Sequence, residues 1–300
     1  MSRAPESQTR GHVRRAQTSG FARRRGSSLL FTLCCLFVLS EAALSHARPQ
    51  SDLTPLQREI RVQTERLSST SVEERRDAVV RLGALARPEG SRAAAYALAD
   101  SSAIVRATAA RAVLSLGRDE AATLILPLLR DRDEFVRREA AFALGLTRSP
   151  TCVGALAVAV ETDKKPSVRG AAAVALGQIG DASAAPALSG ALARRLPATG
   201  IFNRLRRKKV EEDEFVRRSA AVSLGQIGSR ESVPALVEAL SDVRSPGDVR
   251  RECARALGRI GDPSAVPALR SVLSAQDPYL SRIAFEALRN IDPQSATRPS

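Results

Sequence analysis

The chain has 300 residues, with 46 Lys and Arg against 32 Asp and Glu, and its formal net charge at pH 7 is +14. It contains two His, four Cys, two Tyr and no Trp. This composition weighs against an enzyme that uses imidazole as metal ligand or general base, and against a nucleic-acid protein that stacks bases on aromatic rings.

Residues 1–47 have the order of a secretory signal peptide. A polar, basic stretch runs to Ser28, the apolar run Leu29–Leu39 follows, and Ser45 and Ala47 stand in A-x-A-like positions. Eleven apolar residues are too few for a comfortable membrane span, which needs about 20. We therefore expect export with cleavage after Ala47, with an uncleaved membrane anchor through Leu29–Leu39 as the alternative.

Residues 48–293 repeat one pattern, in which Val-Arg is followed by small residues and then Leu-Gly. FVRREAAFALG at Phe135 and FVRRSAAVSLG at Phe215 agree at eight of eleven positions. The anchor position of the pattern is occupied by Arg75, Arg106, Arg137, Arg169, Arg217, Arg250 and Ser281. Their spacing is 31 to 33 residues with one interval of 48, and a fixed period in this range predicts a solenoid.

Each unit contains two predicted helices. Val168, Ala172 and Leu176 recur at helical spacing, and a second apolar run precedes each such segment. Gly180-Asp181 and Gly261-Asp262 supply a helix C-cap followed by an N-cap. Alternation of β-branched residues is absent. The sequence therefore predicts an all-α array of about seven two-helix repeats, without strands.

The repeats resemble HEAT-like repeats of the phycobilisome-lyase type, with the motif D-x-D-x-x-V-R-x-x-A-A-x-A-L-G-x-I-G-D, from about Asp52 to Pro293. Asp131, Asp133 and Val136-Arg137 match this motif in full. The resemblance implies a right-handed α-α superhelix whose second helices line the concave surface. It also implies that the motif's Asp and Arg form a ladder between neighbouring repeats, which we favour over a binding role for that Arg column.

Relatives of this repeat type include deoxyhypusine hydroxylases, whose iron sites use His-Glu pairs. Here His12 precedes Val13 and His46 precedes Ala47, so no such pair exists. Bilin lyases are also similar, but no residue set transfers from them. We predict a protein that is not an enzyme and needs neither cofactor nor metal. A lyase- or hydroxylase-related activity is an alternative that rests on the resemblance alone.

A second Arg follows the anchor position in five repeats. These residues, called the Arg row below, are Arg76, Arg138, Arg218, Arg251 and Arg282; Ala107 and Gly170 interrupt them. If the resemblance holds, the Arg row follows the concave surface. Two interpretations remain open, a partner-binding stripe and an ordinary solvated helix face.

The interval of 48 residues marks an insertion at 194–213, between the two helices of the fifth repeat. Insertions in repeat arrays usually project as loops on one face. This one has apolar Ile201 and Phe202 followed by a basic stretch of Arg204, Arg206, Arg207, Lys208 and Lys209. We favour a contact element over a soluble excursion. The acidic stretch from Glu211 is expected to stabilise a helix start through the helix dipole, and residues 294–300 form a tail.

Cleavage after Ala47 would leave a net charge of +9 and two cysteines, Cys152 and Cys253. Two repeats separate them, which is too far for a disulfide, and Cys253 occupies the column of packed Ala172 and Ala220. The leading hypothesis is an exported (periplasmic or secreted), non-enzymatic scaffold that binds an acidic protein partner through the Arg row and the insertion. The alternative is binding of a polyanion or nucleic acid, which the net charge permits.

Overall fold

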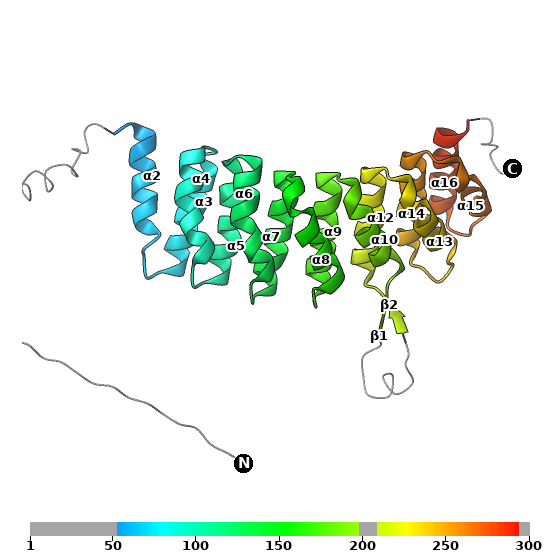
Figure 1. Cartoon of the computed structure of the whole chain (residues 1–300), viewed down its shortest axis with the longest axis horizontal. Helices are drawn as coiled ribbons and strands as arrows, with labels where there is room; N and C mark the ends of the chain where they lie inside the picture. The colour runs from blue at the N-terminus through cyan, green and yellow to red at the C-terminus, as the bar shows by residue number, and fades with distance from the viewer. Residues whose placement is uncertain (1–52, 198–208, 294–300) are drawn as a thin grey trace, which may run out of the picture. The chain divides into compact units, whose positions relative to one another are not determined.

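The computed structural model describes residues 53–197 and 209–293, and every helix and strand below lies in the unit Thr54–Ser300. The described residues of that unit form seven helix pairs (Figure 1). The first helices of the pairs are α2 (Pro55–Arg66), α4 (Pro88–Ala94), α6 (Arg118–Ile125), α8 (Val153–Thr162), α10 (Ala185–Ala193), α13 (Val233–Ser241) and α15 (Val266–Ser271). The second helices are α3 (Val72–Ala84), α5 (Ala103–Ala112), α7 (Glu134–Thr147), α9 (Pro166–Ile179), α12 (Glu214–Ile227), α14 (Gly247–Ile260) and α16 (Pro278–Ile291).

Short 3-10 turns complete the pairs. Two of them extend first helices: η2 (Ala95–Ala99) continues α4, and η4 (Leu126–Arg130) continues α6. The others are η3 (Val113–Ser115), η5 (Pro150–Cys152), η6 (Ala182–Ala184), η7 (Arg230–Ser232) and η8 (Pro263–Ala265). The pairs follow one another in chain order along the array (Figure 1). The predicted all-α fold of about seven two-helix repeats is confirmed.

The helix ends follow from the residues predicted to cap them. Gly180 and Gly261 end α9 and α14 with φ of +77° and +72°, a left-handed conformation that costs glycine little. Asp181 and Asp262 come next, and each accepts a hydrogen bond from a backbone N–H two residues on. The Gly-Asp step therefore specifies the sharp reversal between the second helix of one pair and the first helix of the next.

The core consists mainly of Ala and Leu. Leu144, Leu176, Leu224 and Leu257 are fully buried at equivalent sites of four second helices. Between them lie fully buried alanines such as Ala172. Because alanine adds little width, neighbouring helices approach closely and gain many weak van der Waals contacts.

Glycines set the closest approach between second helices. A Cβ added to Gly145 on α7 would lie 2.7 Å from the Cα atom of Ala175 on α9, closer than real side chains come. Five glycines of the Leu-Gly step, called the glycine row, lie close to the following second helix: Gly83, Gly145, Gly177, Gly225 and Gly258. At Gly177 the nearest atoms belong to the side chains of Ser223 and Gln226, whereas at the other four a backbone Cα atom lies within 3.0 Å of the added Cβ. The Leu-Gly step of the repeat is thus the place where one backbone rests on the next.

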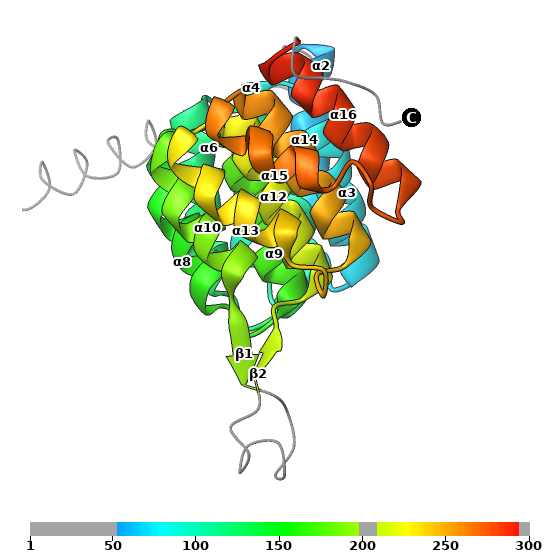
Figure 2. The same cartoon turned by 90° about the vertical axis from the view of Figure 1, so that its right-hand side faces the viewer.

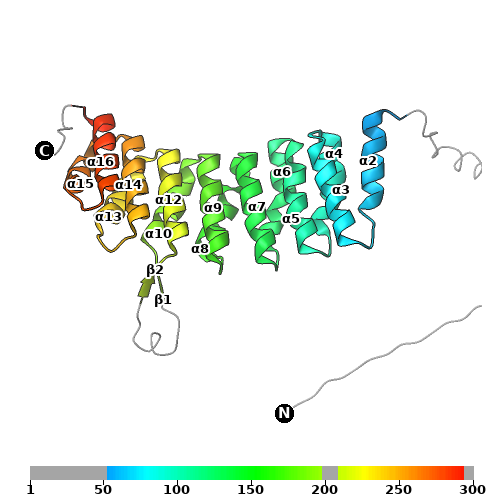
Figure 3. The same ribbon diagram turned by 180° about the vertical axis from the view of Figure 1, so that it is seen from behind.

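One local expectation was wrong, because the described chain contains two strands. β1 (Arg195–Pro197) and β2 (Lys209–Glu211) pair antiparallel, with Arg195 opposite Glu211. They lie between α10 and α12 and project beyond the helix ends (Figures 2 and 3). Each strand has only three residues, too few to show the alternation by which strands are recognised in a sequence.

No helix within residues 53–197 and 209–293 is long and apolar enough to cross a membrane. The proposed signal segment 1–47, including Leu29–Leu39, lies outside the described residues, as does the tail 294–300.

Candidate functional site: the exposed face of the second helices

The first four anchor arginines form the predicted ladder, whereas Arg217 donates to the backbone oxygen of Leu192 and Arg250 to that of Leu240. The Nε and Nη2 atoms of Arg106 donate to both carboxylate oxygens of Asp131 in the next repeat, at 2.7 and 2.8 Å. Its Nη1 donates to the backbone oxygen of Asp100 at 2.8 Å. Both side chains of the ion pair are only 9% exposed. The Arg106 guanidinium lowers the pKa of Asp131, and the Arg75 guanidinium lowers that of Asp100.

The same bidentate geometry joins Arg75 to Asp100 and Arg137 to Asp163. At the insertion the acid changes: Arg169 donates to Glu212, 43 residues further along the chain. Asp213 next to it caps α12 by accepting from the N–H of Phe215, which fits the expected helix start. The sequence did not predict that Glu212 pairs with Arg169. The only sign of this role in the sequence is that Glu212 is an acid a few residues before the Val216-Arg217 pair.

The Arg row lies in the second turn of the second helices, and all of its members except Arg251 stand outside the ladder. Arg76, Arg218 and Arg282 are exposed, and Arg138 and Arg251 are half-buried. Most of these side chains nevertheless have acidic neighbours. Arg251 donates to Asp248 on its own helix and to Asp277 of the next repeat, at 2.7 and 2.9 Å. The row is therefore a chain of ion pairs along much of its length.

Three further ion pairs complete that pattern: Arg138 with Glu139 at 3.2 Å, Arg218 with Asp248 at 3.9 Å, and Arg282 with Glu286 at 3.8 Å. Arg76 has no hydrogen-bond or ion-pair partner among the described residues.

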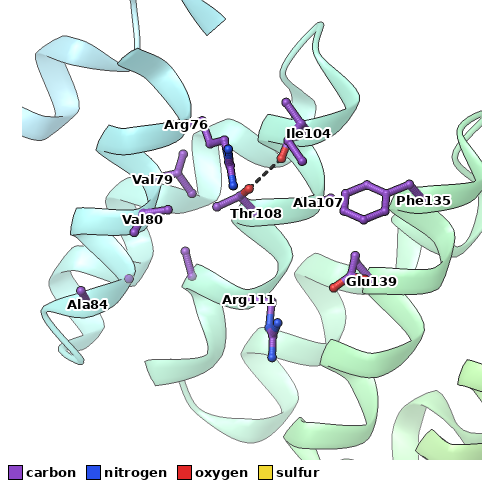
Figure 4. Close-up of a pocket in the computed structure, with 12 residues that line it drawn as sticks. Arg76, Val79, Val80, Ala84, Ile104, Ala107, Thr108, Arg111, Phe135 and Glu139 are labelled. Carbon is purple, nitrogen blue, oxygen red and sulfur yellow. Dashed lines mark hydrogen bonds between the residues drawn. The ribbon is translucent and has the colours of Figure 1, made fainter. Parts of the chain in front are cut away.

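Aromatic rings account for the two interruptions of the row. The ring of Phe215 rests on Gly170, where a Cβ would come within 3.0 Å of three ring atoms. In the same way, Phe135 lies beside Ala107, which is 2% exposed (Figure 4). Small residues stand at these two positions because the following repeat places a ring over them. At Arg251 the ring of Tyr279 lies 5.3 Å from the guanidinium carbon and forms a cation–π contact instead.

Two hollows open on this face. The N-terminal hollow, of about 440 Å³, lies between α3, α5 and α7, and Arg76, Val80, Arg111, Phe135 and Glu139 are among its lining residues (Figure 4). The C-terminal hollow, of about 310 Å³, is lined by Arg218, Asp248, Arg251, Glu252, Arg255, Tyr279, Arg282 and Ile283. The first is largely apolar between its charged groups, whereas the second is a network of opposite charges.

Most of the basic insertion falls outside the described residues, including Ile201, Phe202, Arg204, Arg206, Arg207 and Lys208. The backbone of Lys209 belongs to β2. The β pair leaves the array where a first helix ends and a second helix begins. The ladder and the Arg row lie near the same ends of the second helices, so the insertion emerges next to the row.

The two cysteines of the described chain are free and buried, as expected, in different repeats. Burial raises the pKa of the Cys253 thiol to about 12. Within the described residues, no three His, Cys, Asp or Glu side chains gather as a metal site would require.

Paired helices, the Arg–acid ladder and the glycine row, which recurs on five of the seven second helices described, define a two-helix-repeat solenoid. HEAT repeats match residues 122–199 and 243–298, and the PBS lyase HEAT-like repeat matches residues 216–242. The chain belongs to the HEAT repeat family, with repeats of the PBS lyase type. No curated protein matches it in sequence.

Solved structures of other proteins are similar to this chain. The YibA protein of E. coli is 19% identical with a TM-score of 0.55, over 90% of this chain and 99% of YibA. A chain of the CpcE–CpcF complex of phycocyanin lyase from Nostoc is 24% identical with a TM-score of 0.45, over 81% of this chain and 89% of the matched chain. Human deoxyhypusine hydroxylase is 21% identical with a TM-score of 0.38, over 79% and 96%.

Proposed function

We propose that this protein is a non-enzymatic scaffold that binds an acidic protein partner through the exposed face of its second helices, assisted by the basic insertion. One observation carries the proposal. At Arg75-Arg76 and Arg137-Arg138 the repeat places two arginines side by side, and only the first joins the inter-repeat ladder. Apart from Arg251, which pairs with Asp277 of the next repeat, the members of the Arg row stand outside the ladder with part or all of the side chain accessible.

The net positive charge supports the same conclusion. A positive field steers acidic partners toward the surface and speeds their encounter. The ion pairs of the Arg row do not neutralise this effect, because exposed pairs such as Arg218–Asp248 are weak and can exchange partners. Carboxylates of the partner would compete with Asp248 for the guanidinium.

Polyanion or nucleic-acid binding is less well supported. Proteins that bind single strands stack the bases on aromatic side chains, and this chain has two Tyr and no Trp. Lyase or hydroxylase chemistry has no residue set on this face to carry it.

A charge reversal tests the binding face. The partner is first captured in native cells by a photo-crosslinking amino acid at Tyr279, which is 60% exposed on this face, and then purified. Changing Arg138, Arg218 and Arg282 together to Glu should raise the Kd at least tenfold with unchanged helicity by circular dichroism. The matched control reverses Arg87, Arg118 and Arg130, exposed arginines of the first-helix side. Equal Kd values for the two variants would reject this face as the binding surface.

We further propose export, with cleavage after Ala47. The support is the order of basic, apolar and small residues in 1–47. Mass spectrometry of the native protein should find Arg48 at the N-terminus in the exported fraction. An intact N-terminus in the cytosol would contradict export, and the salt dependence of DNA binding would then need measurement.

A further inference from the structure

The basic groups of the second-helix face are not equivalent. Seven arginines lie in the Arg row or one helical turn after it: Arg76, Arg111, Arg138, Arg218, Arg251, Arg255 and Arg282. Five of them have a carboxylate within 3.9 Å. Only Arg76 and Arg111 have no hydrogen-bond or ion-pair partner among the described residues. Both of these line the N-terminal hollow.

The hollow between them is apolar. Val79, Val80, Ile104 and Ala107 contribute to its lining. Thr108 lies between the two arginines in Figure 4, and its hydroxyl donates to the Ile104 carbonyl at 2.7 Å, so its hydrogen bond is already made within α5. A ligand therefore meets an apolar floor with a guanidinium at each side.

Charge within the hollow is positive. Its one acidic lining residue, Glu139, accepts from Arg138 at 3.2 Å and is only 16% exposed. Glu139 is thus already neutralised by a neighbour that points along the same face. Two guanidiniums remain to be matched by a ligand, in a hollow of about 440 Å³, which is within the usual range of binding pockets.

We propose that this hollow binds an acidic peptide segment of the partner, with an apolar side chain on the floor and a carboxylate on each side paired with Arg76 and Arg111. A lone phosphate would leave the apolar floor uncovered. A fatty carboxylate would satisfy one guanidinium and leave the other. A peptide with two acidic residues around an apolar one matches both cations and the floor.

This inference rests on the proposed function but narrows it to the first three repeats. It assigns the specificity of the scaffold to one hollow, while the rest of the Arg row contributes general attraction. The two proposals can therefore fail separately.

A random peptide library selected on the full chain tests the hollow directly. The Kd of each selected peptide is then measured for the wild type, for both single variants and for the double variant Arg76→Gln, Arg111→Gln. We expect peptides with Asp or Glu on both sides of an apolar residue, whose Kd rises about tenfold for each guanidinium lost. The matched control, Arg259→Gln on α14, removes an exposed arginine outside the hollow and should leave the Kd unchanged.

The apolar floor has its own variant, Val80→Asp, on an exposed position of α3. It should abolish binding of the selected peptides without altering helicity. Peptides without acidic enrichment, no recovered peptide, or equal binding to the double variant would overturn the proposal. Binding of decanoate without any selected peptide would overturn it in favour of a small carboxylate. If the native partner depends on Arg218 and Arg282 but not on Arg76 and Arg111, only this inference fails.

Discussion

At the scale of single residues, the ladder pair Arg106–Asp131 should matter far more than any surface ion pair. Replacing Asp131 by Asn leaves a nearly buried guanidinium without its carboxylate, which costs about 3 kcal/mol of unfolding free energy. Glu120→Gln breaks the exposed Arg92–Glu120 pair and should cost about 1 kcal/mol or less. Urea unfolding of both variants provides the measurement, and equal losses would contradict a structural ladder.

The ladder also predicts a pH dependence. The native pKa values of Asp100 and Asp131 are lowered by Arg75 and Arg106. Such groups stabilise the fold above the ordinary carboxyl pKa of about 4, and that stabilisation is lost as the pH falls through the lower native values. The stability difference between wild type and Asp131→Asn should therefore be full at pH 7 and shrink below pH 4. A difference that stays constant down to pH 2 would argue against the carboxylate as its source.

Cys253 should be unreactive in the native protein. Its side chain is fully buried and its pKa is raised to about 12 by burial, so almost no thiolate exists at pH 8. Iodoacetamide should modify Cys253 only at the rate at which the protein opens, and rapidly once urea is added. Mass spectrometry of the modified peptides checks this, and fast labelling in the native state would contradict the buried site.

At the scale of helices, the glycine row makes a prediction against helix propensity. Ala normally favours a helix over Gly by about 1 kcal/mol. Yet Gly145→Ala would force a Cβ against the backbone of Ala175 on α9, and we expect a net loss of about 1–3 kcal/mol. Gly190→Ala on α10, where a Cβ meets nothing within 4 Å, should stabilise instead. Thermal unfolding distinguishes the two, and the same sign for both would reject close approach as the cause.

The helices were predictable because their signals are local. Apolar spacing, Gly-Asp joints and the Val-Arg anchor each fall within a few residues of the feature they specify. The strand pair β1–β2 was not predictable, because its three-residue strands join Arg195 to Glu211, sixteen positions apart in the chain. The contact between Glu212 and Arg169 was not predictable for a related reason, since only the insertion places Glu212 opposite Arg169.

At the scale of the whole array, each repeat touches mainly its neighbours, so stability should vary along it. Leu176 on α9 and Leu288 on α16 are both fully buried. Leu288→Ala should speed hydrogen exchange in α15 and α16 and leave the central helices protected, whereas Leu176→Ala should affect helices on both sides of α9. Exchange measured by mass spectrometry would show this, and identical profiles would indicate one all-or-none unit.

The sequence predicted the Arg row, but it did not predict which guanidiniums of that face pair with carboxylates. Which arginines keep a free guanidinium depends on the register between neighbouring helices, as when Asp277 reaches Arg251 from 26 residues away. Arg111 was not singled out at all, because it stands outside the row. A list of basic residues therefore predicts a surface, and packing decides which part of it can accept a ligand.

The ladder has a further consequence for how such a protein changes over generations. Arg75 reaches Asp100, and Arg106 reaches Asp131, across the same 25 residues of chain. Loss of residues 100–130 would bring Asp131 opposite Arg75 and Ala143 opposite Gly83, in place of Ala112. The ion pair and the close helix approach at the new joint would both be of a kind the protein already has. Duplication or deletion of whole units could therefore lengthen or shorten the reach of the protein in steps, without the invention of a new interface.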